Sequence, residues 1–227
     1  DQADWIFCLV RTDPNASKQE GISFIIFDME TPGVSITPIE LISGSSEFCQ
    51  TFFDDVRVPK RFLIGAPGQG WTVGKRLLQY ERSSIGGVGG ARQKTATLDE
   101  FAASYTGRIG GRIGDSTLRA DVLTYNMDQR AYQLTMRRAA DEAANNQAPT
   151  FLSSFFKVYG TEQNMRRSDL VVSIMGSKGL GWAGDGFEPS ERANTRGWLR
   201  SKANSIEGGS SEVQRNIIAK RILGLPD

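Results

Sequence analysis

Residues 206–226 read IEGGSSEVQRNIIAKRILGLP, and this stretch carries the clearest helix signals in the chain. Within it, Ser211-Glu212-Val213-Gln214 has the spacing of a capping box, in which a hydroxyl residue and a Gln three positions later satisfy free backbone N–H groups at a helix start. The stretch closes with a basic pair, a glycine and a proline, which are typical of a helix end. We therefore expect a last helix that starts just after two glycines, Gly208 and Gly209.

Three further helices are predicted upstream of this one. In each, apolar residues recur at the spacing of an amphipathic helix. The first runs from Trp71 to Val88, the second begins at Asp115 or Ser116, and the third begins near Phe151. The apolar stripe expected to face the core in the second of them consists of Leu118, Val122, Leu123, Met127, Ala131 and Leu134. Four helices joined in this order predict an antiparallel bundle.

The sequence before residue 65 predicts short strands. Runs of β-branched and aromatic residues, bounded by Gly, Pro and Asn, occur about every ten residues, which is typical of an antiparallel sheet. The runs are 5–10, 21–27, 33–39 and 48–58. Because so few strands make a thin sheet, this part needs further strands or a covering domain. The predicted fold class is α+β: a partial antiparallel β-domain over residues 1–64, followed by an antiparallel four-helix bundle over residues 65–227.

Composition excludes several classes of function. The 227 residues carry 27 Lys and Arg against 26 Asp and Glu, a formal net charge of +1, which gives no electrostatic argument for binding nucleic acid or an acidic membrane. No apolar run approaches the roughly 20 residues that span a bilayer. The absence of histidine excludes Ser-His and Cys-His triads and imidazole zinc sites, and two cysteines cannot make a four-thiolate site. We therefore expect no metal, and acid–base chemistry from Glu, Asp, Lys, Tyr, Cys or a cofactor.

Glu81 interrupts an apolar pattern. It lies four residues after Leu77 and four before Ile85, so the three share one face of the first predicted helix. Burial of that face would raise the carboxyl pKa towards a value useful to a general base at neutral pH. The alternative is that Glu81 lies at the edge of the stripe, pairs with Arg82 or Lys75 and has no chemical role. The pattern alone leaves both interpretations open.

Two glycine-containing segments could face a ligand. At Gly208–Glu212, free N–H groups at a helix start favour an anionic or strongly accepting ligand, although an ordinary capped helix start has the same pattern. At Gly176–Gly181, a Gly-rich loop follows a helix. Because this loop does not follow a strand and open a helix, we do not expect a Rossmann phosphate loop.

Several segments, in order, resemble the acyl-CoA dehydrogenase family. Residues 52–59 (FFDDVRVP), 63–65 (LIG) and 68–71 (GQGW) look like the end of that family's middle β-domain and the entry to its C-terminal bundle. Tyr80-Glu81-Arg82 looks like the start of the family's central helix. Residues 206–226 are close to its long C-terminal signature. The resemblance spans nearly the whole chain.

The resemblance implies a reaction. Family members use FAD to form a trans double bond between C2 and C3 of an acyl-CoA: a carboxylate removes the C2 proton while C3 gives hydride to flavin N5. The electrons then pass to an electron-transfer flavoprotein. The same resemblance implies a homo- or hetero-oligomer, a dimer or tetramer, that works in fatty acid and lipid metabolism, in the bacterial cytoplasm or in the mitochondrial matrix of a eukaryote. A chain without histidine fits this chemistry, because the protein supplies one base and positioning.

The resemblance also bears on the position of the base. Many members carry a Glu two residues before the hydroxyl pair of the C-terminal signature, and that position here is Gly208, with Glu207 one residue away. Members for branched or long chains instead carry the base in a Glu-Arg pair of the central helix and keep a small residue at the vacated site. Glu81 and Arg82, together with Gly208, match this second pattern. We therefore assign the base to Glu81, with Arg82 supporting the site and Glu207 as the rival.

The same resemblance implies substrate and flavin contacts for the corner before the last helix. By position, Gly208 and Gly209 would border the thioester of the substrate. Ser210, Ser211 and Glu212 would contact the flavin.

Two other parts of the flavin site depart from the family pattern. The family's Arg-x-x-Phe-Gly, which reaches the flavin of a neighbouring subunit, has no clean counterpart, and Arg108 stands in for its arginine. Ser173 replaces the usual Gln before the Gly-rich loop; within that loop Gly176 remains and Ser177 replaces the second glycine. Some bacterial members work as mixed pairs in which one subunit keeps only part of the flavin site, so a non-catalytic partner subunit is a second hypothesis. A related flavin oxidase or nitroalkane-type enzyme is a third.

The resemblance also implies missing parts. The family has an N-terminal helical domain and an earlier half of the β-domain before the Ala3-Asp4-Trp5 stretch, and the chain has no initiating Met. We expect it to be a fragment that is inactive alone, because much of the flavin and acyl pocket would come from the missing part.

Overall fold

The computed structural model describes residues 2–85, 97–145 and 152–226, and the chain divides into two compact units, Asp1–Tyr80 and Glu81–Asp227. The division falls inside a helix. The domain boundary expected at residue 65 stays a prediction.

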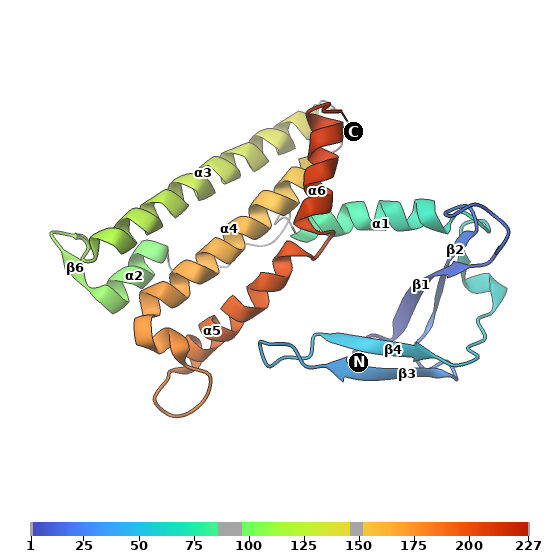
Figure 1. The fold of residues 1–227 in the computed structure, drawn as a ribbon, viewed down its shortest axis with the longest axis horizontal. Coiled ribbons are helices and arrows are strands. Elements are labelled where there is room, and N and C mark those ends of the chain that lie inside the picture. Colours follow the sequence, from blue (N-terminus) through green and yellow to red (C-terminus); the bar gives the residue numbers. More distant parts are fainter. Residues whose placement is uncertain (1, 86–96, 146–151, 227) are drawn as a thin grey trace. The chain divides into compact units, whose positions relative to one another are not determined.

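The first unit contains two small antiparallel sheets (Figure 1). The three-stranded sheet has the order β1-β2-β5, and Cys8 of β1 lies opposite Ile25 of β2. The second sheet pairs β3 with β4. The strands are β1 (Trp5–Arg11), β2 (Ile22–Asp28), β3 (Val34–Ile39), β4 (Phe48–Phe53) and β5 (Leu63–Ile64), and a 3₁₀ helix, η1 (Lys60–Phe62), precedes β5. The four predicted strand runs are therefore confirmed, except that the fourth ends at Phe53 and does not reach Val58.

Aromatic rings form the core of this unit. The buried Phe27 of β2 meets Phe53 of β4 edge to face, with ring centroids 5.8 Å apart. The buried Phe24 stacks on Phe7 of β1 at 5.2 Å. Such pairs stabilise a fold by about 1 kcal/mol beyond the area that they bury. Phe7 and Phe53 remain about half exposed, so these thin sheets leave apolar surface open, as expected for few strands.

Helix α1 (Gly70–Ile85) starts against the larger sheet because its first residue is a glycine. A Cβ atom on Gly70 would lie 2.3 Å from the backbone carbonyl carbon of Ser23 in β2. One turn later, a Cβ on Gly74 would lie 3.4 Å from the side chain of Leu9 in β1. The start of α1 therefore approaches β2 more closely than any side chain would allow.

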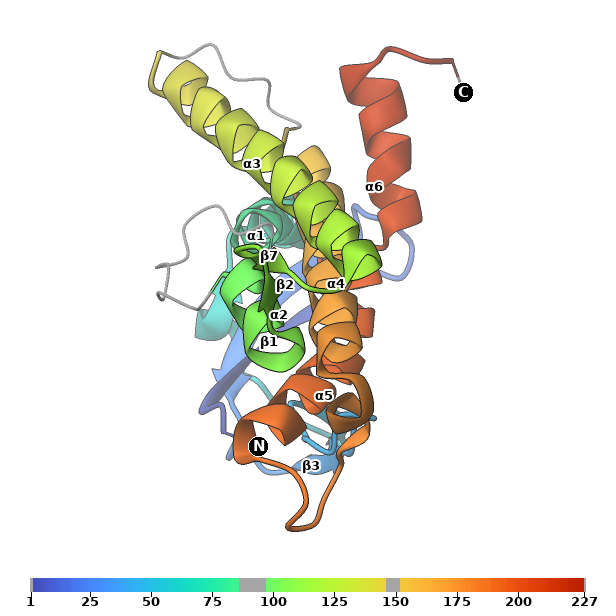
Figure 2. The ribbon, with the colours of Figure 1, turned by 90° about the vertical axis from the view of Figure 1, so that its left-hand side faces the viewer.

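The second unit is a helical bundle built around α4. Its elements are α2 (Leu98–Thr106), β6 (Arg108–Ile109), β7 (Arg112–Ile113), α3 (Ser116–Ala144), α4 (Leu152–Met175), the 3₁₀ helix η2 (Gly176–Leu180), α5 (Pro189–Ser201), the 3₁₀ helix η3 (Lys202–Ser205), α6 (Ser211–Ile217) and its π-helical extension η4 (Ile218–Ile222). Helix α4 packs against α2, α3, α5 and α6. Figure 1 shows α4 between α3 and α5, and Figure 2 shows α2 beside it.

The architecture has the predicted fold class, a partial antiparallel β-domain followed by an antiparallel helical bundle. The central position of α4 explains why it buries residues around its whole circumference. Two helices, α2 and α5, are absent from the sequence prediction. The predicted extension of the first helix to Val88 lies outside the described residues.

The buried face of α3 differs from the predicted one. Four residues of the predicted stripe are exposed: Leu123, Met127, Ala131 and Leu134. Val122 of the predicted stripe is buried, and Tyr125 and Tyr132 enter the core in place of the four exposed residues. The predicted stripe is therefore wrong over most of its length, because two tyrosines with large apolar bodies turn the other face towards α4.

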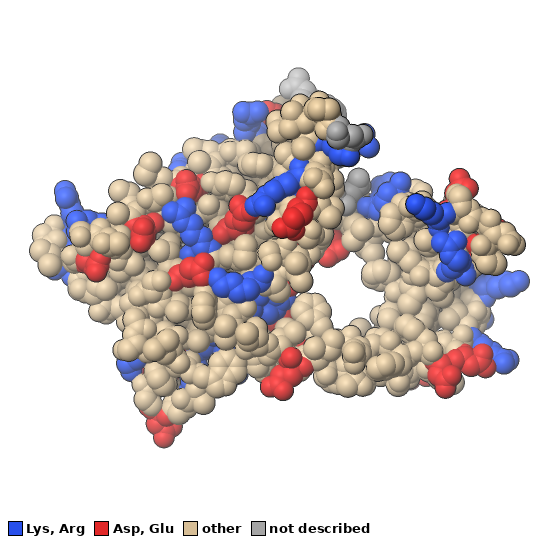
Figure 3. Space-filling model, in the orientation of Figure 1, with Lys and Arg blue, Asp and Glu red and all other residues tan. Residues whose placement is uncertain are grey.

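Charge is spread rather than concentrated. Acidic and basic side chains are interspersed over the face of the second unit that Figure 3 shows, in line with the net charge of +1. Across residues 2–85, 97–145 and 152–226, no helix is long and apolar enough to cross a membrane. Those same ranges hold no cluster of three or more His, Cys, Asp or Glu side chains that could bind a metal.

Candidate functional site

The face of α1 that carries Glu81 is open to solvent in this chain. Glu81 is exposed, and Leu77, one turn before it, is 38% exposed. Of the two interpretations that the pattern left open, the chain alone shows an exposed Glu81 and not a buried one. The side chains of Arg82 and Ile85 lie outside the described part of the structure, so the Glu-Arg pair and the end of the stripe stay predictions.

The rival carboxylate, Glu207, is held on both of its oxygens. The guanidinium of Arg200 lies 2.6 Å from Oε1, and the side-chain amide of Asn204 donates to Oε2 at 2.7 Å. Both members of the ion pair are about three-quarters buried. A carboxylate that is engaged in this way must break an ion pair before it can take a proton from a substrate.

The corner between η3 and α6 depends on two glycines in the left-handed region. Gly208 has a φ of 63° and Gly209 a φ of 89°. A Cβ on Gly209 would lie 2.5 Å from the side-chain amide of Gln214, which donates to the Gly208 carbonyl at 2.8 Å. The corner is therefore tight: Gln214 occupies the space where a Gly209 side chain would lie, and neither glycine carries a side chain of its own to keep a flat group from its backbone.

The start of α6 is capped by Ser210. Its hydroxyl accepts a hydrogen bond from the Val213 N–H at 3.3 Å, so the cap lies one residue before the predicted Ser211. Hydrogen bonds from its own N–H and from Ser210 lower the pKa of Glu212, which places a negative charge in the first turn. A strongly anionic ligand is therefore a poor match at this helix start, and an uncharged acceptor is a better one.

The Gly-rich segment after α4 folds as η2. Gly179 and Gly181 are buried, and a Cβ on either would collide with Val172 or Phe187 respectively, so their lack of a side chain serves packing. The predicted cofactor contacts at this end of α4, Ser173, Gly176 and Ser177, are all exposed, and the Ser173 hydroxyl donates to a carbonyl of its own helix.

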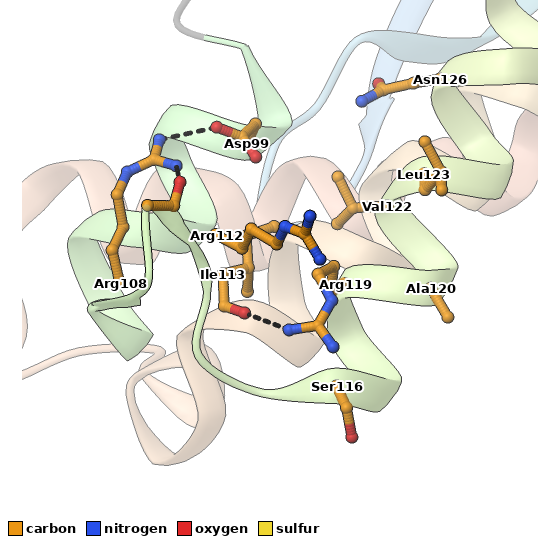
Figure 4. A pocket seen from close by; sticks show the side chains of 11 residues that line it. Asp99, Arg108, Arg112, Ile113, Ser116, Arg119, Ala120, Val122, Leu123 and Asn126 are labelled. Atoms are coloured by element: carbon orange, nitrogen blue, oxygen red, sulfur yellow. Dashed lines mark hydrogen bonds and ion pairs between the residues drawn. The ribbon is translucent and has the colours of Figure 1, made fainter.

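The second unit contains a pocket of about 560 Å³ at the β6–β7 hairpin (Figure 4). Three arginines from the hairpin and α3, Arg108, Arg112 and Arg119, line it, together with one carboxylate, Asp99. The other lining residues are Gly111, Ile113, Ser116, Ala120, Val122, Leu123 and Asn126. The side chains of the pocket therefore carry two more positive charges than negative ones.

The three guanidinium groups are engaged to different degrees. Arg108 pairs with Asp99 at 2.6 Å and donates to the Gly111 carbonyl at 3.0 Å. Arg119 donates to the Ile113 carbonyl at 2.9 Å and keeps further N–H groups. The guanidinium of Arg112 has no hydrogen-bond or ion-pair partner within the described ranges, although the residue pairs with Ile109 in the hairpin. Fork-shaped donors with spare N–H groups are the side chains that bind phosphate oxygens best.

Sequence reasoning identified Arg108 alone and missed Arg112 and Arg119. The available signal was the repeat Gly-Arg-Ile-Gly over residues 107–114, which has a Gly-Gly turn at its centre. Both turn glycines, Gly110 and Gly111, have positive φ, as a two-residue hairpin turn requires. That hairpin brings its two arginines to one pocket.

Comparison of the sequence with known proteins identifies its family. The model of the family described as "Acyl-CoA dehydrogenase, C-terminal domain" matches residues 68–223. A protein named Acyl-CoA dehydrogenase IpdE1 from Mycobacterium tuberculosis is 32% identical over 227 residues, which cover 99% of this chain and 56% of that protein. Acyl-CoA dehydrogenase FadE29 of the same organism is 31% identical and is covered over 57% of its length. The chain thus spans about half the length of these relatives.

Solved structures give the same result for the fold. The structure titled "Tcur3481-Tcur3483 steroid ACAD" is similar with a TM-score of 0.85 at 26% identity, over 99% of this chain and 57% of that one. The ChsE4-ChsE5 complex from Mycobacterium tuberculosis is similar with a TM-score of 0.77 at 24% identity, over 99% of this chain and 58% of that one.

Proposed function

The chain belongs to the acyl-CoA dehydrogenase family, and from this premise we propose that the whole protein oxidises an acyl-CoA thioester between C2 and C3, with FAD as the hydride acceptor and Glu81 as the base that takes the C2 proton. The observation that carries the choice of base is a contrast between two carboxylates. Glu207 has partners on both oxygens, whereas Glu81 is exposed on α1 and has no partner among the described residues. The proposal concerns the whole protein, because the relatives are about twice as long as this chain.

An unengaged carboxylate suits the proposed task. Among the described residues, Glu81 has no ion pair that must break before it accepts a proton. Because Glu81 is open to water in the chain alone, the bound acyl group and cofactor would have to exclude that water, which strengthens the electrostatic interactions of the base. Gly208 and Gly209 would let the thioester approach the backbone, where N–H groups can polarise its carbonyl and acidify the C2 proton.

The donors of the second unit fit FAD in two places. The pocket of Arg108, Arg112 and Arg119 has the charge and the fork-shaped donors that a diphosphate requires. At the corner, neutral hydroxyl and backbone groups match the uncharged rim of a flavin ring better than a phosphate. The proposed corner contacts are Ser210, Ser211 and Glu212, and those at the end of α4 are Ser173, Gly176 and Ser177.

A second candidate function is a non-catalytic partner subunit in a mixed assembly. Serine at positions 173 and 177 is the observation that favours it, since both depart from the family pattern. Two of the similar structures also have titles that name two components. Flavin content of the whole protein expressed alone separates the two: one FAD per chain would count against a partner subunit.

The electron acceptor, the assembly and the cellular location are proposed from the same family membership. We propose an electron-transfer flavoprotein as the electron acceptor, a homo- or hetero-oligomer as the working form, and the bacterial cytoplasm as the location. Cys8 and Cys49 form no disulfide in the described part of the chain, which agrees with a reducing compartment.

A product assay tests the proposed function. The whole protein is incubated with an artificial electron acceptor and a panel of straight-chain, branched and steroid side-chain acyl-CoA thioesters. We expect a 2,3-enoyl product from at least one thioester. Oxygen consumption without the artificial acceptor would instead identify a flavin oxidase, and the absence of product from the whole panel would contradict the proposal.

A further inference from the structure

Lys157 of α4 is completely buried, and no step proposed above uses it. Its exposed fraction is 0%, and it is the largest of the fully buried side chains in the described part of the chain. Lysine is almost never fully buried unless it is paired. The ammonium group makes no ion pair with a described residue, and its one hydrogen bond goes to the backbone carbonyl of Ser205, 3.4 Å away.

The carbonyl of Ser205 joins Lys157 to the glycine corner. The same oxygen accepts a hydrogen bond from the Ser211 hydroxyl at 3.3 Å. Residues 206–210 therefore lie between Ser205 and Ser211, which this hydrogen bond joins, and Lys157 of α4 donates to the same oxygen. A second contact comes from α6, where the side-chain amide of the buried Gln214 donates to the Gly208 carbonyl at 2.8 Å.

Carboxylates near Lys157 favour its charged form. Burial is the larger effect and lowers the pKa of Lys157, and the carboxylates of Glu207, Glu212 and Glu162 offset part of this. Glu207 and Glu212 flank the corner, so a positive charge at Lys157 attracts a carboxylate at each end of the corner. Ser154, one turn before Lys157 on the same helix face, is also fully buried and has a hydroxyl with no partner among the described residues.

We propose that Lys157 is a positioning residue: its buried charge holds the Gly208–Ser211 corner in the geometry that the thioester and the flavin require. The inference rests on the proposed function, because it assigns a task to the corner in that reaction. A neutral residue of the same length would leave the helices packed and let the corner move. Misplacement of a reacting group by about 1 Å can reduce a rate about a hundredfold.

The test uses the whole protein with three variants. Lys157→Met removes the charge and keeps the length, Lys157→Arg keeps a charge, and Lys202→Met is the matched control, because Lys202 joins η3 to Asp169 of α4 at an exposed site. Hydrogen exchange of the amides of residues 206–213 reports on the corner, and exchange in α3 reports on the bundle. Turnover with the best thioester of the panel reports on function.

For Lys157→Met we expect exchange in residues 206–213 to be faster by about tenfold or more, α3 to be unchanged, and kcat to fall by about tenfold or more with a smaller change in KM. Lys157→Arg should restore most of the slow amide exchange in residues 206–213 and most of kcat. Lys202→Met should stay within about twofold of the wild type in both measurements.

The proposal would be overturned if Lys157→Met leaves exchange and kcat unchanged. It would also be overturned if exchange in α3 becomes faster as well, or if Lys157→Arg behaves like Lys157→Met. If the wild-type protein dehydrogenates no thioester, the proposed function fails by itself, and the exchange measurement still decides whether Lys157 holds the corner.

Discussion

The guanidinium of Arg200 lies 2.6 Å from the carboxylate of Glu207, and both groups are about three-quarters buried. The pair fixes the chain just before the glycine corner, since Asn204 holds the other oxygen of the same carboxylate. Glu207 therefore has a structural task that explains its presence next to the family's usual base position.

This pairing predicts the effect of Glu207→Gln in the whole protein. The variant replaces the partly buried ion pair with a neutral contact, so the free energy of unfolding should fall by about 1–3 kcal/mol. Turnover should stay within about threefold of the wild type, because the side chain takes no proton. Urea unfolding and acyl-CoA oxidation measure the two effects. An unchanged stability together with a loss of turnover would make Glu207 the base.

The arginine pocket predicts a loss of cofactor affinity. Arg112→Ala removes a guanidinium that has no protein partner in the described ranges, so little stability should be lost. A charge-assisted hydrogen bond to a phosphate contributes about 1.5–3 kcal/mol, which corresponds to FAD binding weaker by about ten- to a hundredfold. Titration of the apoprotein with FAD measures the affinity.

The control for this prediction is Arg138→Ala. Arg138 is 79% exposed and pairs with Glu142 on the surface of α3, away from the pocket lining. Its removal should change FAD affinity by less than about twofold. Equal affinities for Arg112→Ala and the wild type would remove the pocket from the proposed cofactor site.

The two glycines of α1 predict opposite outcomes for the same substitution. In Gly70→Ala the new Cβ meets the backbone of Ser23 at 2.3 Å, and because backbone cannot yield, the free energy of unfolding should fall by about 3 kcal/mol or more. In Gly74→Ala the nearest atom is a Leu9 methyl at 3.4 Å, and the better helix propensity of Ala should add up to about 1 kcal/mol. Urea unfolding compares the two, and equal midpoints would show that α1 does not start against β2 as described.

Tyr132 predicts a loss of stability at high pH. Burial raises the pKa of Tyr132 from 10 to about 12, and its hydroxyl donates to the Phe156 carbonyl at 3.0 Å. A group with a raised pKa in the fold contributes stability that is fully present below pH 10 and is lost as the pH rises to 12. The loss should be roughly 2–3 kcal/mol.

Tyr132→Phe is the matched variant, because it keeps the ring and removes the ionisable group. The difference in unfolding free energy between wild type and Tyr132→Phe should shrink between pH 10 and 12. Parallel pH profiles of the two proteins would show that the hydroxyl is not buried.

Local signals were enough to predict most of the elements of this fold. The strand runs and the long helices follow from periodicity and from caps such as Asp115, whose carboxylate accepts from the Leu118 N–H at 2.8 Å. The face that α3 buries could not be predicted, because both of its faces carry apolar residues and only the position of α4 decides between Leu123 and Tyr125. Helix α2 was missed although Thr97 and Glu100 form a capping box.

The candidate site could be predicted only in part. Glu81 and Gly208 lie in or beside segments that resemble motifs of the family. The resemblance was therefore enough to propose them as site residues. Arg119 comes to the pocket only because α3 packs beside the hairpin, and no local pattern contains that information. Burial of Lys157 is likewise a property of the packed bundle. Its apolar neighbours Phe156 and Val158 indicate a helix near the core, but they do not show that other helices surround α4.

The central claim is that Glu81 takes the C2 proton, and exchange of that proton with solvent tests it most directly. The whole protein is mixed with an acyl-CoA in heavy water, and deuterium at C2 is measured for wild type, Glu81→Gln and Glu207→Gln. We expect Glu81→Gln to lose exchange by about a hundredfold or more, whereas Glu207→Gln exchanges at nearly the wild-type rate. Undiminished exchange in Glu81→Gln, with a loss in Glu207→Gln, would contradict the account.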